Sequence, residues 1–320
     1  MSDIVGLVLP FFGLIFIGFF VARISRQPVE ALGWMNTFVI YVALPALFFQ
    51  LLARTPFEEL TEWSFIFGSV FSTYLVFSAM FVASALLSGG EIAESTIKGL
   101  ASAYGNIGYM GPGLAVLAFG EQVAVPVALI FCFENIMHFT IAPMMMALAG
   151  DDKRPLPQLA AGIASRIVLH PFIVATAIGV AAAYFEFRPP VPLERLLSYL
   201  SAAAAPCALF AMGVTLALRP LKRVPHEIAP IAVLKLIVHP LLCYAMLSWV
   251  GHFSETWVFS AVLLAALPTA TNVFVIAQQY GVWVQRASAS ILITTCVSVV
   301  SLTGLLYMIR SGVLPADLFP

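Results

Sequence analysis

A run of glycine and proline inside an apolar segment carries the first sign of chemistry in this sequence. Residues 95–119 are apolar for long enough to cross a bilayer, yet four glycines and Pro112 lie between Tyr104 and Gly113. Proline lacks an N–H and clashes with the preceding turn, and glycine weakens a helix. We therefore expect the helix to break here and to leave backbone groups that lipid cannot satisfy. Such a break must face protein or a wet cavity.

A second break is expected between Leu267 and Asn272, in the apolar segment 256–280. Two interrupted segments at matching places in two halves are typical of the binding site of a secondary transporter. The half-helices that follow are expected to begin near Gly113 and Val273, with Thr271 and Asn272 as N-caps, and to direct partial positive charge at the membrane centre. This pattern predicts a carboxylate site without a full positive charge. The alternative is that both breaks are kinks satisfied by neighbouring helices.

The residues expected to bind substrate come from these two breaks and from a mid-span proline that lines the substrate path or belongs to a rigid wall. They are Asn106, Gly108, Tyr109, Met110, Gly111, Pro45, Pro268, Thr269, Thr271 and Asn272.

Two charges lie deep in apolar segments. Glu134 is central in its segment, next to Asn135 and close to His138, and Lys235 lies about nine residues into another. A charge at that depth costs roughly 2.5–3.5 kcal/mol on insertion scales, so a partner is expected. A Glu134–Lys235 ion pair is the simplest account. It is either a structural bridge or a proton-coupling pair in which Glu134 or His138 titrates.

The composition defines the class of protein that must hold these residues. Of 320 residues, 61% are hydrophobic and 10% are charged, with a mean hydropathy of +1.00. This predicts an all-α polytopic membrane protein, because a span needs roughly 20 apolar residues. Ten segments fit: about 4–23, 34–53, 63–88, 95–119, 122–148, 160–185, 195–218, 227–250, 256–280 and 286–310. The net charge of −1 excludes nucleic acid as a partner. The four cysteines show no metal-ligand spacing, so neither a metal nor a cofactor is expected.

The charges between the segments predict the orientation. With both termini outside, ten Lys or Arg residues lie at the cytoplasmic ends and four at the outer ends, as the positive-inside rule requires. The chain also repeats itself at an offset of 161 residues, which places Pro10 on Pro171, Pro45 on Pro206 and Ile107 on Pro268. Five spans in each half make the second repeat inverted. The predicted organisation is a first repeat (1–150), a short cytoplasmic linker (151–159) and a second repeat (160–320).

Three motifs resemble the auxin efflux carrier family over essentially the whole chain. They begin at Asn36 and Leu44-Pro45, at Gly105-Asn106, and at Ala266-Leu267-Pro268. The resemblance implies crossed, broken fourth and ninth helices, as in the similar fold of sodium/proton antiporters. It also implies a scaffold of spans 1, 2, 6 and 7 that forms a homodimer, and a moving transport domain of spans 3–5 and 8–10. Asn106 matches the substrate-binding asparagine of the family. Pro112, one residue after Gly111, departs from the family pattern, in which an Ile-Pro pair often comes a little later.

The reading that follows is a secondary transporter of a small organic anion, such as malonate, in the inner membrane. Proton symport and export down a gradient both remain open. The alternative is a sodium-coupled carrier of bile-acid type, which needs oxygen ligands at the breaks. An intramembrane enzyme is disfavoured because His138 has no nucleophile in a recognisable motif, and ATP-driven transport because no phosphate-binding loop occurs.

Overall fold

The computed structural model describes residues 2–56, 62–150, 155–218 and 226–318. Within these ranges the secondary structure is helical, apart from one isolated β-bridge, and the chain divides into two compact units. Unit 1 contains Met1–Glu62, Gly108–Cys132 and Leu169–Pro220, and unit 2 contains Trp63–Ile107, Phe133–Val168 and Leu221–Pro320. Each unit is therefore assembled from segments that are far apart in the sequence.

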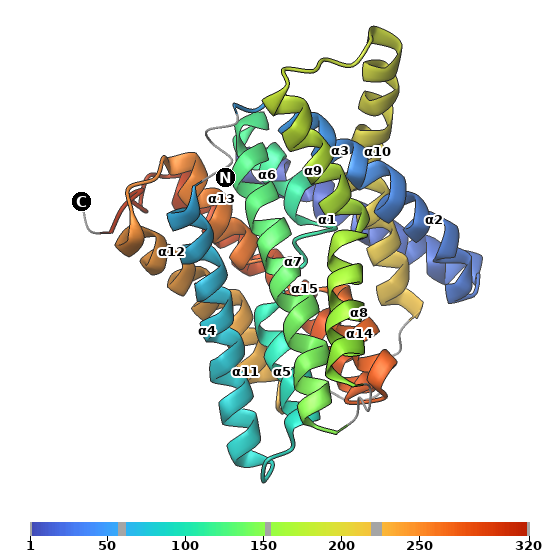
Figure 1. The fold of residues 1–320 in the computed structure, drawn as a ribbon, viewed down its shortest axis with the longest axis vertical. Coiled ribbons are helices and arrows are strands. Elements are labelled where there is room, and N and C mark those ends of the chain that lie inside the picture. Colours follow the sequence, from blue (N-terminus) through green and yellow to red (C-terminus); the bar gives the residue numbers. More distant parts are fainter. Residues whose placement is uncertain (1, 57–61, 151–154, 219–225, 319–320) are drawn as a thin grey trace. The chain divides into compact units, whose positions relative to one another are not determined.

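The described residues of unit 1 form the following elements, of which the α-helices are labelled in Figure 1. They are α1 (Ser2–Ser25), the 3-10 turn η1 (Val29–Leu32), α2 (Gly33–Phe38), the π turn η2 (Val39–Ala43), α3 (Leu44–Leu52), α6 (Gly111–Phe119), the 3-10 turn η4 (Glu121–Val123), the first part of α7 (Ala124–Leu148), α9 (Pro171–Tyr184) and α10 (Val191–Leu218).

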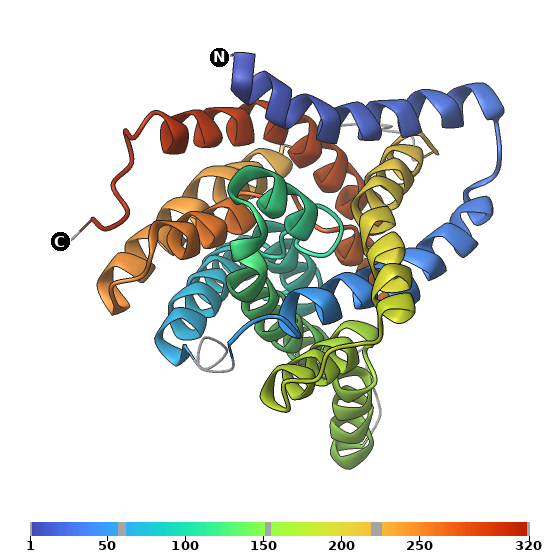
Figure 2. The ribbon, with the colours of Figure 1, turned by 90° about the horizontal axis from the view of Figure 1, so that it is seen from above.

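Small residues let the helices of unit 1 approach closely. α1 packs along α10, and α3 packs against α9 and α10 (Figure 2). A Cβ added to Gly18 on α1 would overlap the backbone carbonyl of Phe210 on α10. A Cβ added to Gly179 on α9 would lie 3.3 Å from the carbonyl oxygen of Phe49 on α3. Glycine is thus required at Gly18, because the partner there is backbone, whereas at Gly179 the fit is tight, with Cβ of Leu52 at 3.0 Å as the nearest atom.

Unit 2 holds the remaining elements, which pack through α4, α12 and α15. They are α4 (Trp63–Leu87), α5 (Ile92–Ala103), α7 from Phe133, α8 (Leu156–Val168), α11 (Ile228–Val233), the π turn η5 (Leu234–Val238), α12 (His239–Val250), α13 (Glu255–Ala265), α14 (Thr271–Tyr280) and α15 (Val284–Arg310). α4 packs against α5 and α12, α12 against α13, and α14 against α15.

Six helical stretches in the described ranges are long and apolar enough to cross a membrane. They are Gly33–Leu52, Trp63–Leu87, Glu121–Leu148, Val191–Leu218, Ile228–Val250 and Val284–Arg310, and each coincides with a predicted span. The predicted span 4–23 corresponds to α1, and the other three are interrupted helices.

Two of these interruptions lie where the sequence predicts them, between α5 and α6 and between α13 and α14. The third was not predicted. The segment 160–185 is interrupted between α8 and α9 at Leu169 and His170, directly before Pro171. Proline disfavours the helical region for the residue before it, and His170 is indeed extended, with ψ 128°. His170-Pro171 therefore ends a helix rather than merely shaping one.

The predicted linker 151–159 is shorter than expected, because α8 already begins at Leu156. Its residues 151–154 lie outside the described residues, as do the basic residues Arg219, Lys222 and Arg223 of the predicted cytoplasmic side.

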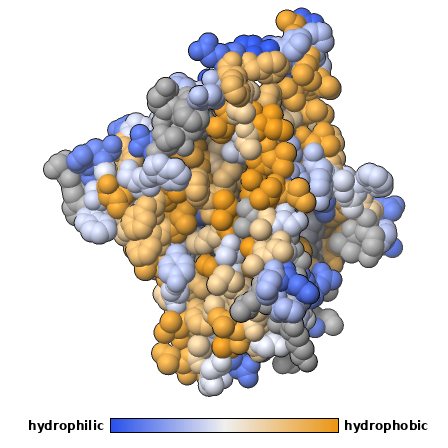
Figure 3. Space-filling model, in the orientation of Figure 1, coloured by the Kyte–Doolittle hydropathy of each residue, from blue (hydrophilic) through white to orange (hydrophobic). Residues whose placement is uncertain are grey.

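Apolar side chains dominate much of the surface seen in Figure 3. Large exposed ones include Phe16 and Phe20 on α1, Phe67 on α4, Leu241 on α12 and Val300 on α15. Such area exposed to water is unfavourable, whereas lipid covers it without cost. The helices of both units therefore present surfaces suited to a bilayer.

Candidate functional site: a double helix break in unit 2

The two predicted breaks meet in unit 2 as antiparallel extended segments. Gly105 and Thr269 form an isolated antiparallel bridge. The N–H of Asn106 donates to the carbonyl of Pro268 at 2.8 Å, and the N–H of Ala270 donates to the carbonyl of Tyr104 at 2.9 Å. Each break thus satisfies backbone groups that the other leaves without helical partners, which is why both persist away from water.

The local sequence explains where the helices end. α5 ends at Ala103 because Tyr104 is already extended, with ψ 98°, and Gly105 follows. α13 ends at Ala265, shortly before Pro268, which cannot donate to a helical carbonyl. α14 then begins at Thr271, capped by the extended residue Ala270, whose side chain makes no cap hydrogen bond. The prediction that Thr271 and Asn272 are N-caps is therefore wrong, since both lie inside the first turn.

Tyr104 gathers the polar side chains of this region. Its hydroxyl donates to Oδ1 of Asn135 at 2.6 Å and accepts from Nδ2 of Asn272 at 2.8 Å. The ring of His138 stacks on the tyrosine ring, with centroids 3.8 Å apart. Three predicted site residues thus meet around one that the sequence analysis did not select. Its position directly before Gly105-Asn106 was the available signal.

The imidazole of His138 is buried in this region without hydrogen bonds among the described residues. It is 0% exposed, and neither ring nitrogen has a hydrogen-bond partner among the residues that the structure describes. A buried donor or acceptor without a hydrogen bond costs about 1–3 kcal/mol of stability. An imidazole held in this way by stacking is a candidate to donate a hydrogen bond to a bound ligand.

The other residues of the two breaks are buried to different degrees. Asn106 is 1% exposed and Thr271 is half-buried. The hydroxyl of Thr269 donates to the carbonyl of Ala101 at 2.7 Å, and its N–H donates to Oγ1 of Thr294 at 3.1 Å. Thr269 therefore ties the break to α5 and α15, which is a structural role.

The expected direct ion pair between Glu134 and Lys235 is absent: among the described residues, the ion pairs involve other side chains. Instead, Nζ of Lys235 donates to the carbonyl of Ala265 at 2.6 Å and lies 2.9 Å from Nδ1 of His239. The carboxylate of Glu134 accepts a hydrogen bond at 2.8 Å from the hydroxyl of Thr73. The ammonium of Lys235 thus lies at the C-terminal end of α13, where the last carbonyl groups have no helical partner and a positive charge is favoured.

Lys235 consequently lies at the double break itself. A Cβ on Gly105 would be only 3.2 Å from Nζ of Lys235, so the ammonium rests against this glycine. Lys235 belongs to the π turn η5, which precedes Pro240, a residue with no N–H for the carbonyl four positions earlier. The sequence predicts an anion site without a full positive charge, and the structure places the amine of Lys235 against these two segments.

The remaining predicted site residues belong to unit 1. Gly108, Tyr109 and Met110 form the turn before α6, which begins at Gly111. A Cβ on Gly108 would lie 3.3 Å from the ring of Phe131. Pro45 is half-buried in the first turn of α3, after the π turn η2.

An ion network joins the starts of three helices of unit 2. Nζ of Lys98 lies 2.6 Å from Glu94 and 2.8 Å from Glu227, and Arg286 lies 2.6 Å from Glu227. Glu227 precedes α11, outside the span. Its partial burial alone would raise the pKa of the carboxyl, but the hydrogen bond and charge of Lys98, the charge of Arg286 and the indole N–H of Trp283 together lower that pKa.

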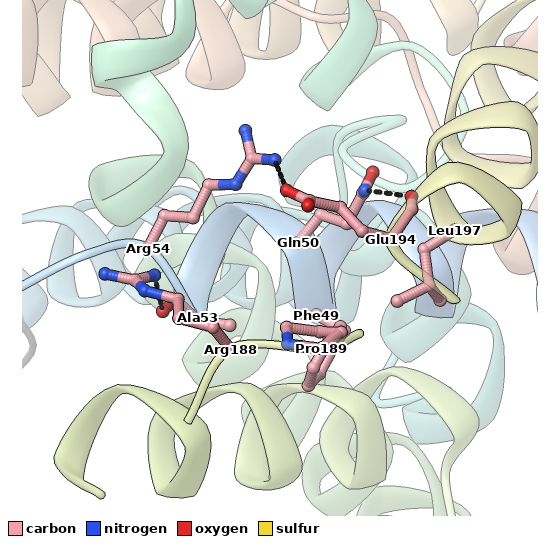
Figure 4. A pocket seen from close by; sticks show the side chains of 8 residues that line it. All are labelled: Phe49, Gln50, Ala53, Arg54, Arg188, Pro189, Glu194 and Leu197. Carbon is pink, nitrogen blue, oxygen red and sulfur yellow. Dashed lines mark hydrogen bonds and ion pairs between the residues drawn. The ribbon is translucent and has the colours of Figure 1, made fainter. Parts of the chain in front are cut away.

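Unit 1 contains a separate pocket of about 180 Å³, shown in Figure 4, which is lined by both apolar and charged side chains. Arg54 reaches Glu194 at 2.6 Å, Gln50 donates to the backbone carbonyl of Glu194 at 3.4 Å, and Arg188 donates to the carbonyl of Ala53 at 2.9 Å. A cavity of about 400 Å³ shares Gln50 and Arg54. Because the side chains of Arg54 and Glu194 are about half exposed, solvent screens charge here more than at the buried double break, and this pocket is the weaker candidate for an anion site.

The comparisons with known proteins agree with a carrier. The family model described as "Membrane transport protein" matches residues 3–165 and 156–306. The chain belongs to this family, which confirms the resemblance to auxin efflux carriers. A protein of Rhizobium meliloti (strain 1021) named "Putative malonate transporter" is 64% identical over 320 residues, the whole of both chains. "Uncharacterized transporter YfdV" of Escherichia coli (strain K12) is 24% identical over 325 residues, which cover 97% of this chain and 99% of the other. Both relatives are named as transporters rather than enzymes.

Proposed function

We propose that this protein is a secondary transporter of a small organic anion, such as malonate, and that the double break in unit 2 binds the substrate. The observation that carries the proposal is the ammonium of Lys235 beside two paired, buried helix breaks. Family membership supports the transport function, and the name of the Rhizobium relative supports malonate as the first substrate to test.

The groups around the break suit a carboxylate. The first N–H groups of α14, on Thr271 and Asn272, have no intrahelical acceptor, as at any helix N-terminus. The buried imidazole of His138 offers a donor, and Lys235 offers a charge. Asn106 is assigned to substrate by the family resemblance and lies buried in the same break. In a site of low dielectric a charge-assisted hydrogen bond is about twice as strong as a neutral one.

Alternating access is supported by signs of an inverted repeat. At the offset of 161 residues, Gly18 corresponds to Gly179 and Phe49 to Phe210. Gly18 contacts Phe210, and Gly179 contacts Phe49. This reciprocal exchange is what a two-fold relation between repeats produces. We assign ten spans to two inverted five-helix repeats, with scaffold spans 1, 2, 6 and 7 and transport spans 3–5 and 8–10 moving as an elevator.

The finer features of the proposal follow from the sequence. Residues Gly108, Tyr109, Met110, Gly111, Pro45 and Pro268 would line the substrate route. The protein would lie in the inner membrane with both termini outside, in contact with lipid and paired as a homodimer through the scaffold spans.

The test compares binding and uptake of malonate in a matched pair of variants. His138→Phe retains an aromatic ring to stack on Tyr104 but removes both nitrogens. A lost hydrogen bond to a charged group is worth about 1.5–3 kcal/mol, so malonate affinity should fall about 10- to 100-fold. His252→Phe is the control, because this histidine is 81% exposed and pairs with Asp317 away from the breaks. Binding is read from thermal stabilisation and uptake from proteoliposomes, each with and without sodium.

Equal malonate affinity in His138→Phe and the wild type would remove the double break as the binding site. Stabilisation by sodium alone, with no response to any dicarboxylate, would instead favour the sodium-coupled carrier.

A further inference from the structure

A continuous chain of buried polar groups leads away from the double break. Nζ of Lys235 lies 2.9 Å from Nδ1 of His239, and Nε2 of His239 lies 2.9 Å from Oγ1 of Thr73. Oγ1 of Thr73 lies 2.8 Å from Oε1 of Glu134. None of the four side chains is more than 4% exposed. They come from η5, α12, α4 and α7, so four elements of unit 2 contribute to one chain.

When Lys235 is protonated and Glu134 is ionised, the donors and acceptors allow one direction for the hydrogens of this chain. An ammonium can only donate, so Nδ1 of His239 must accept. A neutral imidazole then carries its hydrogen on Nε2 and donates to Thr73. The single hydroxyl hydrogen of Thr73 is left for Glu134, which at 2.8 Å is closer than the carbonyl of Ser69 at 3.3 Å. His239 and Thr73 therefore form an ordered hydrogen-bond chain between the ammonium of Lys235 and the carboxylate of Glu134.

A purely structural bridge needs no such intermediates. Two oppositely charged side chains are most stable in direct contact, because the attraction falls with distance and each charge must be desolvated. Here the charges are held apart by two groups that can each accept one proton while releasing another. Other titratable groups lie beside these four residues. His138 on α7 interacts electrostatically with Lys235 and His239, and Cys243 on α12 interacts with Lys235 and Glu134. Tyr104 stacks on His138.

We propose that Lys235, His239, Thr73 and Glu134 form the proton path that couples transport to protons, a role that rests on the proposed function. In one shift, an N–H bond of Lys235 breaks as Nδ1–H of His239 forms. The Nε2–H bond breaks as a new O–H forms on Thr73, and the old hydroxyl O–H breaks as Glu134 is protonated. Lys235 becomes neutral, Glu134 becomes neutral, and the total charge is unchanged. The cycle closes when hydronium on one side gives a proton to Lys235 and becomes water, and water on the other side accepts the proton of Glu134, so that one proton has crossed and both groups regain their charges.

The path is tied to substrate by the position of Lys235 at both breaks, against Gly105 and the carbonyl of Ala265. While the proton is on Lys235, the site holds a cation and attracts a carboxylate. Once the proton has moved to Glu134, that attraction is gone. The location of one proton thus sets whether the site binds or releases its anion.

Thr73 offers the sharpest test, because valine has the same shape without the hydroxyl and serine restores it. In proteoliposomes, malonate uptake, malonate–malonate exchange and the accompanying proton movement are measured for Thr73→Val, Thr73→Ser and a control, Thr140→Val. Thr140 lies on α7, and its hydroxyl donates to the carbonyl of Ile136 at 2.7 Å, outside the proposed path. Thr73→Val should reduce proton-driven uptake about tenfold or more while malonate affinity changes less than about threefold, since positioned proton donors typically contribute 10²–10⁴-fold. Thr73→Ser and Thr140→Val should behave as the wild type.

His239→Gln is the second variant, because an amide can keep both hydrogen bonds but cannot pass a proton. If Thr73→Val fails to bind malonate, His239→Gln provides the test of the proton path. His239→Gln should retain malonate–malonate exchange and lose proton-driven uptake. Proton movement that persists in His239→Gln, or wild-type uptake without any proton movement, would overturn the path and leave the transporter intact. A wild type that neither binds nor moves any dicarboxylate would overturn the proposed function, and the path with it.

Discussion

Lys235→Met should be among the most destabilising substitutions in this chain. Methionine matches the length and apolar stem of lysine but removes the ammonium, and with it the hydrogen bonds to Ala265 and His239. It also leaves Glu134, 4% exposed, as a buried carboxylate without its balancing charge. Breaking a buried pair in direct contact costs about 3–5 kcal/mol. Because His239 and Thr73 separate these two charges, we expect the free energy of unfolding to fall by about 3 kcal/mol, the lower end of that range.

The reasoning behind this number is tested by adding a second substitution. Glu134→Gln removes the uncompensated charge and keeps an acceptor for Thr73. In the variant carrying both substitutions the loss should shrink to about 1–2 kcal/mol, as expected when a buried pair is replaced rather than broken. The assay is reversible unfolding in mixed detergent micelles, with Arg195→Met, an exposed position, as the control. Additive losses in the two single variants would refute the electrostatic link between these residues through His239 and Thr73.

Three further outcomes follow from the packing and the charges of the described residues. Gly18→Ala on α1 should cost about 1–3 kcal/mol, because its Cβ overlaps the carbonyl of Phe210, whereas Gly13→Ala, with nothing within 4 Å, should be tolerated in the same thermal melts. The depressed pKa of Glu227 means that its contribution to stability is present at neutral pH and is lost as the pH falls through the folded value; Glu227→Gln should therefore lower the melting temperature at pH 7 and flatten its decline below about pH 4.5. Arg54→Gln should change the free energy of unfolding by less than about 1 kcal/mol, because the ion pair of Arg54 is half exposed, and a larger loss would show that solvent screens it less than its exposure implies.

The position of the breaks was predictable from the sequence because it depends on local chemistry. Pro268 and the glycines after Tyr104 forbid a continuous helix whatever surrounds them. The partners of Lys235 depend on tertiary packing, which periodicity does not reveal. Sequence reasoning paired the only two deep charges with each other, and it did not foresee that the carbonyl end of an interrupted helix competes for the cation. The role of Tyr104 was missed for the same reason, since its contacts come from α7 and α14.

The pairing of the breaks changes what the site must use to hold an anion. Two N–H groups of the breaks, on Asn106 and Ala270, are taken by backbone carbonyls, and that of Thr269 by Thr294. Dipoles and free N–H groups are therefore fewer than two open breaks would supply. A dicarboxylate carries two charges that the low-dielectric interior must balance. Lys235 is the cation that the described residues place against the paired segments, and its charge is adjustable through His239 and Thr73. Substrate affinity should thus depend on the protonation of Lys235 more than on the helix termini. Thr271→Pro removes the N–H of the first residue of α14 and is tolerated at that position, and it should bind malonate far better than Lys235→Met paired with Glu134→Gln.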